Sequence, residues 1–264
     1  MRTMKRLLWL PLLMVLFAPA VAGEGGEIEW MTDPSDALRA AEEQNRLLLV
    51  DAWAPWCAPC FEMDETTWKD PGVAEAVDPF VRLKINHDVQ KLFVERYAIE
   101  HLPILLVLDP AGDEVTRVYG FHSAEQVRTL SDRLLTGYEA FAEAADARKD
   151  PEAQARAAEF LLEVGGYPRA LKICKKALRR AKGDAALTAR LSLALGEAQL
   201  GDGQARAATR TFSELLEDLP GTDQARGRAL LGLVRSERER GRDDEADAAL
   251  QQLREDFPDL AEGV

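Results

Sequence analysis

Two cysteines separated by two residues, Cys57 and Cys60, are the side chains of this 264-residue chain whose types and spacing point most directly to chemistry. They follow an apolar run at 47–53 that suits a buried strand, and a helix is expected to begin at Cys57. A helix N-terminus offers free N–H groups and a partial positive charge, which favour the nucleophilic thiolate. Cys60 is expected one turn further in and more buried, where it can attack a mixed disulfide on Cys57. The spacing therefore predicts a redox pair.

Three other uses of the pair stay open on the sequence alone. A zinc site needs four ligands, and the remaining candidates have no ligand spacing to the pair: His87, His101, His122 and Cys174. Copper(I) suits soft thiolates and would need His101 close to the pair. A purely structural disulfide across so short a loop would stabilise little. The redox pair is favoured over these, so the sequence predicts no metal and no cofactor beyond the Cys57–Cys60 disulfide itself.

Strand and helix patterns alternate around the pair. Helices are predicted at 33–45, 61–68, 89–97 and 123–135, and strands at 47–53, 81–85, 104–108 and 115–119. The Asp-Pro-Gly sequence at 70–72 is expected to end the second helix, and the last two strands are expected to form a hairpin. Ser123 is the expected N-cap of the last helix, with Gln126 three residues on. This order predicts an α/β fold in which helices cover both faces of a sheet.

Beyond residue 150 the strand patterns end and a helical repeat begins. Small and apolar residues recur 38 residues apart in three sets: Gly165, Gly203 and Gly241; Ala170, Ala208 and Ala246; Cys174, Phe212 and Leu250. A period in this range predicts stacked helix pairs. The pattern resembles tetratricopeptide repeats with a slightly longer period. Cys174 occupies an inter-helix core position in it, which predicts a buried, inert thiol.

The segment from Leu49 to Cys60, which contains Trp-Ala-Pro-Trp-Cys-Ala-Pro-Cys, resembles the active-site strand and turn of thioredoxin. Asp51 falls at that family's buried acid, six residues before the first cysteine, and Lys84 falls at the lysine that neighbours this acid. Pro103 matches the family's cis-proline. The resemblance implies a thioredoxin fold and a thiol–disulfide oxidoreductase.

Residues 68–73 also resemble the stretch after the cysteines in the C-terminal periplasmic domain of DsbD-type transmembrane thiol reductases. The combined resemblance covers residues 28–137.

The resemblance implies a proton acceptor beneath the cysteines. Burial is expected to raise the pKa of Asp51, and a neighbouring Lys84 is expected to lower it. A carboxylate of this kind can accept the Cys60 proton and prepare that sulfur to attack.

The resemblance also implies a client-binding surface. If Pro103 is cis, Leu102 presents its backbone to a partner strand. The family usually has threonine after this proline; Ile104 stands here, which leaves the choice of client open. Trp56 borders the cysteines, where it either shields the sulfurs or packs as an ordinary aromatic residue.

The chain is acidic, with a formal net charge of −13, which argues against a nucleic-acid partner. Residues 23–149 contain 12 basic and 25 acidic residues, whereas 150–264 contain 18 and 21. Seven cations nevertheless crowd one predicted helix of the repeats: Arg169, Lys172, Lys175, Lys176, Arg179, Arg180 and Lys182. They form either a solvated face or a docking patch for an acidic partner or for the chain's own acidic domain.

Residues 1–22 have the pattern of a signal peptide, with a basic start, an apolar run and a small-residue cleavage site at Ala20-Val21-Ala22. An uncleaved N-terminal anchor is the alternative. The pattern predicts a periplasmic or otherwise exported protein, where thiols are oxidised unless something reduces them.

These observations predict a signal peptide (1–22), a thioredoxin-like domain (23–137), a linker (138–150) and tetratricopeptide-like repeats (151–264). The pair encloses Ala58 and Pro59 rather than histidine, and the acidic side chains just after it disfavour the thiolate: Glu62, Asp64 and Glu65. We therefore expect a reductase of exported protein disulfides, recharged by a membrane electron donor, whose repeats hold a protein partner. The alternative is a binding or assembly module, in which the repeats act and the thioredoxin fold is a platform.

Overall fold

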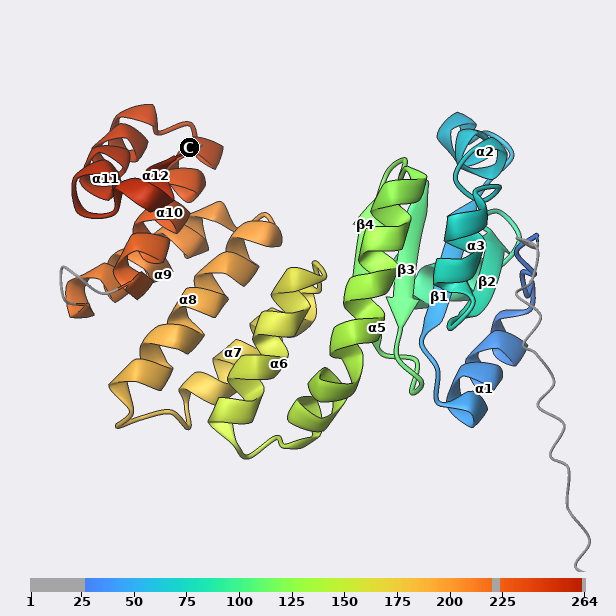
Figure 1. Cartoon of the computed structure of the whole chain (residues 1–264), viewed down its shortest axis with the longest axis horizontal. Helices are drawn as coiled ribbons and strands as arrows, with labels where there is room; N and C mark the ends of the chain where they lie inside the picture. Colours follow the sequence, from blue (N-terminus) through green and yellow to red (C-terminus); the bar gives the residue numbers. More distant parts are fainter. Residues whose placement is uncertain (1–26, 220–223, 263–264) are drawn as a thin grey trace, which may run out of the picture.

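The computed structural model describes residues 27–219 and 224–262. A four-stranded sheet flanked by helices forms the first part of the molecule, and a stack of helices forms the second (Figure 1). The α/β fold followed by an all-helical domain is thus confirmed. The predicted signal peptide at 1–22 lies outside the described residues, so it stays a prediction.

The sheet contains the four predicted strands in the order β2-β1-β3-β4. They are β1 (Leu48–Trp53), β2 (Val81–Asn86), β3 (Ile104–Leu108) and β4 (Glu114–Tyr119). β1 pairs with β2 in parallel and with β3 antiparallel, and β3 and β4 form the expected antiparallel hairpin. Every residue of β3 is buried, and so is every residue of β1 except Trp53. This is expected of central strands that are covered on both faces.

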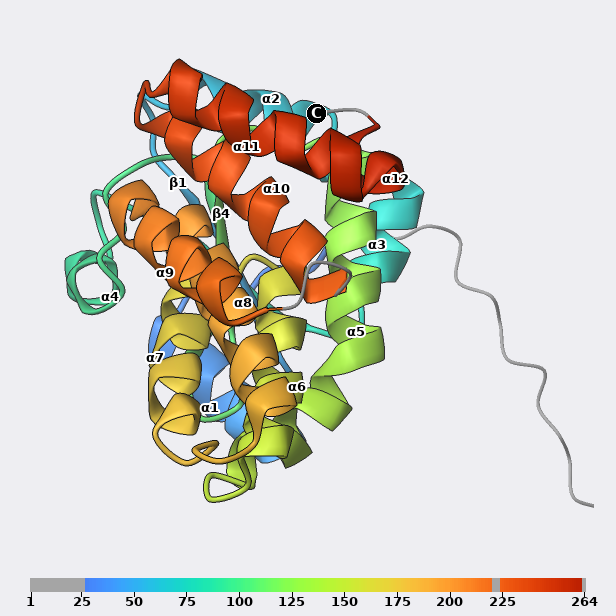
Figure 2. The same ribbon diagram turned by 90° about the vertical axis from the view of Figure 1, so that its left-hand side faces the viewer.

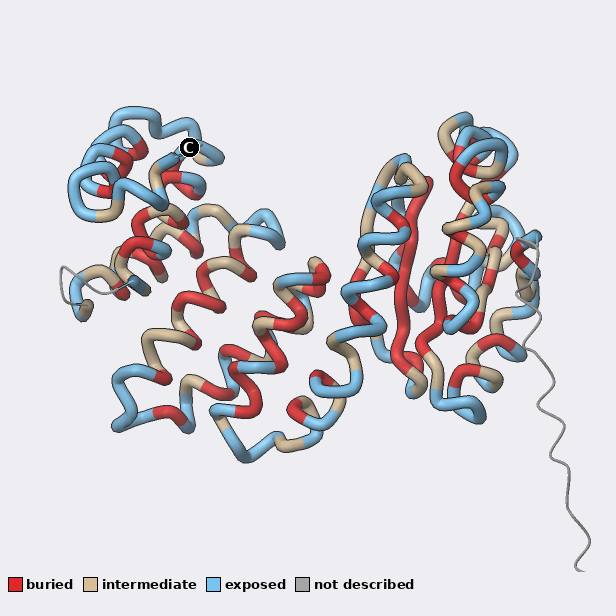
Figure 3. The backbone as a smooth tube through the Cα atoms, in the orientation of Figure 1, coloured by how far each residue is buried: buried red, intermediate tan, exposed pale blue. Residues whose placement is uncertain are grey.

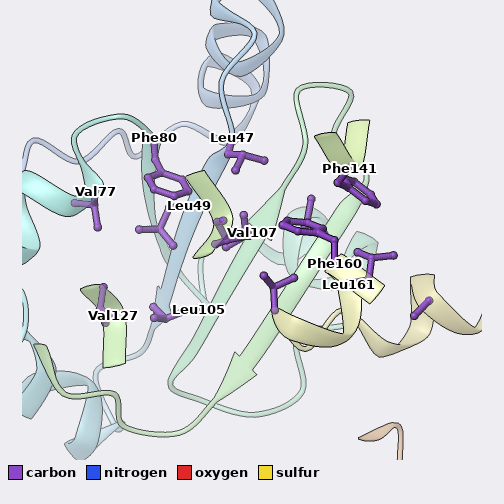
Figure 4. Close-up of a cluster of buried hydrophobic side chains, with 14 of the residues drawn as sticks. Leu47, Leu49, Val77, Phe80, Leu105, Val107, Val127, Phe141, Phe160 and Leu161 are labelled. Carbon is purple, nitrogen blue, oxygen red and sulfur yellow. The ribbon is translucent and has the colours of Figure 1, made fainter. Parts of the chain in front are cut away.

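Helices cover both faces of this sheet. Alternate side chains of the central strands point to opposite faces, so each face presents apolar residues against which helices pack. On one face, Leu48 and Val50 pack with α1 (Pro34–Gln44) and α4 (Lys91–Arg96). On the other, Leu49, Leu105 and Val107 pack with α2 (Ala58–Glu65), α3 (Pro71–Val77) and α5 (Ala124–Asp146). Figure 4 shows this second cluster around Leu49, Leu105 and Val107.

Three predictions about where helices begin or end were wrong. The helix expected to reach Trp68 ends at Glu65, and the Asp-Pro-Gly sequence expected only to break it starts α3 instead. The Asp70 carboxylate accepts a hydrogen bond from the Val73 N–H, and Pro71 occupies the first turn, where its missing N–H costs nothing. The range 138–150, predicted as a linker, is helical as far as Asp146, because α5 continues through it.

The second part of the molecule consists of three helix pairs and a short terminal helix. These are α6 (Pro151–Glu163) with α7 (Tyr167–Leu178), α8 (Ala185–Gly201) with α9 (Ala205–Asp218), α10 (Gln224–Glu239) with α11 (Asp243–Asp256), and α12 (Pro258–Ala261). Figure 2 shows the pairs following one another.

The 38-residue period corresponds to one helix pair. Gly165, Gly203 and Gly241 take φ values of 77°, 72° and 69°, so each pair uses a glycine to turn between its helices. Ala170, Ala208 and Ala246 and the set of Cys174, Phe212 and Leu250 are all buried, at most 4% exposed. Figure 3 shows buried segments along the central strands and along the inner sides of the repeat helices.

One hydrophobic cluster continues from the sheet domain into the first repeat. Phe141 of α5 stacks on Phe160 of α6, with ring centroids 4.9 Å apart (Figure 4). The Thr116 hydroxyl of β4 donates a hydrogen bond of 2.5 Å to the Val164 carbonyl. Arg169 of α7 forms a 2.9 Å ion pair with Asp109, at the end of β3. The basic helix therefore contacts the chain's own acidic domain through Arg169.

Candidate active site

Cys57 and Cys60 are joined by a disulfide at the start of α2, with their Cα atoms 5.3 Å apart. Cys57 is the N-cap residue of this helix, as the sequence predicted, and Pro59 lies in its first turn. Cys57 thus lies at the positive end of the helix dipole, which stabilises a thiolate there when the disulfide is reduced. The pair thus fits a redox-active Cys-x-x-Cys motif.

The expected difference in burial between the two cysteines was wrong. Each is 3% exposed in this disulfide state. The physical reason is that both cysteines belong to a buried cluster with Ala54, against which Trp53 and Leu102 pack.

Asp51 and Lys84 are 33 residues apart in the sequence. They lie side by side, as predicted, because β1 and β2 pair in parallel register at these two residues. The Lys84 ammonium is 3.0 Å from the Asp51 carboxylate, which is 2% exposed. Burial raises the pKa of Asp51 to about 6, against the opposing effect of Lys84. Burial by itself would lower the pKa of Lys84, but its two carboxylate neighbours raise it, so the lysine stays charged.

The second of those neighbours is Asp64, which sequence reasoning missed as a partner of Lys84. Its carboxylate accepts a hydrogen bond from the same ammonium group. Lys84 therefore bridges a carboxylate of β1 and a carboxylate of α2, and it also lies over the Trp30 ring at 5.7 Å. The signal was available: Asp64 comes one helical turn after Cys60, so the two residues share the side of α2 that faces the sheet.

Ion pairs offset part of the negative charge that follows the cysteine motif. Of the three acidic residues after the motif, Asp64 is neutralised by Lys84 and Glu65 pairs with Lys69. Glu62 is left without an ion-pair partner among the described residues. The acidic stretch thus disfavours the Cys57 thiolate less than three unpaired charges would.

The proline loop lies against the disulfide. The Leu102–Pro103 peptide bond is cis, and Leu102 packs against the buried cluster that contains the two cysteines. The Gly120 N–H donates a hydrogen bond to the Pro103 carbonyl, which joins the end of β4 to this loop. The structure thus brings together Cys57, Cys60 and Leu102.

Trp56 lies apart from this group. It is 63% exposed, and its indole N–H donates a 2.9 Å hydrogen bond to the Asp88 carboxylate. Trp53, rather than Trp56, packs against the cysteines. Two further exposed aromatic residues that the sequence reasoning missed are Tyr119 and Phe121, which flank Gly120 beside the proline loop. The available signal in the sequence was the pair of aromatic residues at the end of the predicted hairpin.

The histidines considered as metal ligands have other contacts. The His101 ring packs edge-on against Tyr119 at 6.1 Å, and the His87 and His122 rings contact the backbone carbonyls of Ile99 and Gly120. Residues 27–219 and 224–262 hold no group of three or more His, Cys, Asp or Glu side chains that could bind a metal ion.

Cys174 is buried in the repeats, as predicted, and has no disulfide partner. Burial raises the pKa of its thiol to about 12, so it stays protonated.

No helix in the described part of the chain is both long and apolar enough to cross a bilayer.

Comparison with protein families agrees with the two-part architecture. Residues 29–110 match the thioredoxin-like family model, and residues 228–260 match the tetratricopeptide-repeat model.

Curated relatives match the first part of the chain. The thiol:disulfide interchange protein DsbD of Pseudoalteromonas atlantica is 33% identical over 111 residues, which are 40% of this chain and 19% of that protein. DsbD of Haemophilus influenzae is 29% identical over 101 residues, or 36% of this chain and 17% of that protein. The chain thus spans less than a fifth of the length of these relatives.

Solved structures that resemble the chain include a thioredoxin from Thermus thermophilus, 22% identical with a TM-score of 0.38, covering 42% of this chain and 88% of that one. The oxidised C-terminal domain of Neisseria meningitidis DsbD is 21% identical with a TM-score of 0.36, covering 40% and 98%.

Proposed function

Because the chain carries a thioredoxin-like domain followed by tetratricopeptide repeats, we propose that it is a thiol–disulfide oxidoreductase that reduces disulfides of exported proteins. The observation that carries the proposal is the Cys57–Cys60 disulfide at the start of α2, packed against Leu102 of the proline loop. The thiol:disulfide interchange proteins DsbD that match the first part of the chain support the same chemistry. The location outside the cytoplasm is proposed from the signal-peptide pattern at residues 1–22.

In the proposed reaction, the reduced protein meets a client disulfide. The Cys57 thiolate attacks one client sulfur, an S–S bond forms between them, and the other client sulfur leaves as a thiolate. The Cys60 thiolate then attacks the Cys57 sulfur, which restores the Cys57–Cys60 disulfide and releases the second client sulfur as a thiolate. Two electrons pass from the cysteine pair to the client.

Asp51 is proposed to accept the Cys60 proton before the second attack. A carboxyl with a pKa of about 6 is mostly ionised at neutral pH and can still hold a proton for a short time. Lys84 keeps that carboxylate in place from β2 and, through Asp64, ties it to the helix that bears the cysteines.

The direction of electron flow rests on the residues of the motif. No histidine lies between the cysteines to stabilise a thiolate, and a less stable thiolate gives a less oxidising disulfide. Regeneration then requires a dithiol donor, for which we propose a membrane protein. Protein partners would bind the repeats, and Trp56, Tyr119 and Phe121 would offer exposed aromatic surface to a client near the disulfide.

The reduction potential of the pair tests this proposal. We expect a reversible two-electron couple near the thioredoxin value of about −270 mV when the protein is equilibrated with a dithiothreitol series and free thiols are trapped. A value near the DsbA potential of about −120 mV would reverse the proposed direction. The absence of any reversible couple would refute the enzyme and leave the repeats as the working part. A Cys60→Ser variant should retain clients as mixed disulfides on Cys57, detectable by mass spectrometry.

A further inference from the structure

Helix α7 and the residues just after α5 and α7 carry cations that form no ion pair within the described part of the chain. Five of them line one hollow: Arg148, Lys172, Lys176, Arg179 and Arg180. None of these five side chains forms an ion pair or hydrogen bond with another residue between 27 and 219 or between 224 and 262. All five are exposed.

The hollow lies between the C-terminal end of α5 and helices α6 and α7, and its volume is 570 Å³. Arg169 also lines it, but this guanidinium is already bound to Asp109. Asp146 is the one carboxylate among its lining residues. Gln154, also on the wall, donates its amide hydrogens to two carbonyls of α5 and is therefore occupied.

Several other arginines of the repeats are paired with carboxylates. Arg190 binds Glu152 and Glu159, Arg228 binds Glu197, and Arg240 binds Glu237. In a chain of net charge −13, five exposed cations without an ion pair among the described residues gather at this one hollow. The mutual repulsion of these cations is relieved when negative charge enters between them.

We propose that this basic hollow binds an acidic segment of a protein partner, with carboxylates lying along Lys172 and Lys176 on one wall and near Arg148 on the other. The two walls favour a chain of carboxylates over a flat bilayer surface. α7 also lacks an exposed large apolar side chain with which to enter a membrane. The site goes beyond the redox function, because it lies on the repeats and contains none of the groups that react.

Fluorescence anisotropy of a labelled ten-residue glutamate peptide, titrated with the full chain, tests the proposal. We expect binding at 50 mM salt that is lost at 1 M, where the screening length falls to about 3 Å. The double variant Lys172→Glu/Lys176→Glu should weaken binding about tenfold or more, since two attractions become repulsions. Lys172→Gln/Lys176→Gln should give an intermediate loss.

The matched control is Arg235→Glu/Arg238→Glu, which makes the same change of charge on two exposed residues of α10 that lie outside the hollow and form no ion pair among the described residues. This control should bind the peptide within about twofold of the unaltered chain. Circular dichroism melting of each variant separates loss of binding from loss of folding.

Equal weakening by the control, or no binding of the peptide at all, would overturn the proposal. Binding to vesicles containing phosphatidylglycerol but not to the peptide would identify a membrane surface instead. Self-association that both salt and the Lys172/Lys176 changes abolish, seen by sedimentation in the absence of peptide, would identify a second copy as the occupant. Reduction of a small disulfide should be unchanged in all variants, which keeps this test independent of the redox proposal.

Discussion

The two halves of the chain hold cysteine in opposite environments. In the sheet domain, Cys57 caps the start of α2, where the helix end favours its ionised form, and Cys60 follows one turn later. In the repeats, Cys174 lies inside α7 among buried alanines, and burial raises the pKa of its thiol to about 12. The three sulfurs are all almost inaccessible to solvent, so exposure does not distinguish them. Position on the helix and a second cysteine within reach distinguish the reactive pair from the inert thiol.

The largest effect expected from this comparison is on activity. Cys57→Ser should lower the reduction of a protein disulfide by at least about 10³-fold, because a hydroxyl replaces the nucleophilic thiolate. Cys174→Ala should leave the rate within about twofold, because its thiol stays protonated and buried. Turbidity of reduced insulin, with dithiothreitol as electron donor, measures both. A comparable loss in the two variants would remove the distinction between the halves.

Stability of the repeats depends on a different kind of contact. Phe212 is fully buried, and its ring fits against Gly196 of α8 and Gly232 of α10, where a Cβ atom would come within 2.4 Å of it. Phe212→Ala should lower the free energy of unfolding of this region by about 3–5 kcal/mol, through lost burial and the cavity left behind.

The reduction potential of the Cys57–Cys60 pair should stay unchanged in Phe212→Ala, because the altered contacts lie in the second and third helix pairs. Denaturant unfolding and thiol trapping give the two quantities. A shifted potential would show that the repeats influence the redox site.

Asp51 should have opposite effects on activity and stability. Asp51→Asn removes the proposed proton acceptor, so the rate at neutral pH should fall by roughly 10²-fold. The folded protein keeps a proton on Asp51 up to a pKa of about 6, whereas the unfolded chain releases it near the ordinary value of 3.8. The contribution of this group to stability is therefore complete below about pH 4 and is lost as the pH rises through about 6.

At pH 8, Asp51→Asn should raise the free energy of unfolding of the oxidised protein by about 2 kcal/mol, because no buried charge remains at this position while Lys84 keeps Asp64 as its partner. At pH 4 the gain should vanish. Urea unfolding across this pH range checks the sign, and a gain that is constant with pH would contradict the assigned ionisation.

The redox site could be predicted from sequence where local pattern determined the geometry. The cysteine pair and the strand before it follow from an apolar run and a turn. The closeness of Asp51 and Lys84 was implied only by the resemblance to thioredoxin, and it depends on the parallel register of β1 and β2. Asp64 and the packing of Trp53 depend on which way α2 faces the sheet, and a tertiary contact sets that direction. The start of α3 at Pro71 was misread because proline both ends and begins helices.

For the repeats, the period predicted the helix pairs, because each pair places one glycine, one alanine and one larger residue at the same positions. The contact between the first repeat and β4 could not be predicted in the same way. It depends on groups that are far apart in the sequence, such as Thr116 with Val164 and Asp109 with Arg169. The continuation of α5 through the predicted linker has the same origin, since Phe141 is held by Phe160.

The smallest effect is expected at this junction between the halves. Arg169 pairs with Asp109 at 2.9 Å and lies over the Phe141 ring at 5.0 Å. Arg169→Gln should lower the free energy of unfolding by about 1–2 kcal/mol, since Asp109 loses its charged partner but keeps hydrogen bonds from two backbone N–H groups.

The control is Arg148→Gln, which changes an exposed arginine of the basic hollow that has no ion pair among the described residues. It should change the free energy of unfolding by less than about 0.5 kcal/mol. Hydrogen exchange should show faster opening at Gly166 and Val164 in Arg169→Gln and not in the control. An equal, negligible change in both variants would mean that the apolar contact of Phe141 with Phe160 holds the two halves together without this ion pair.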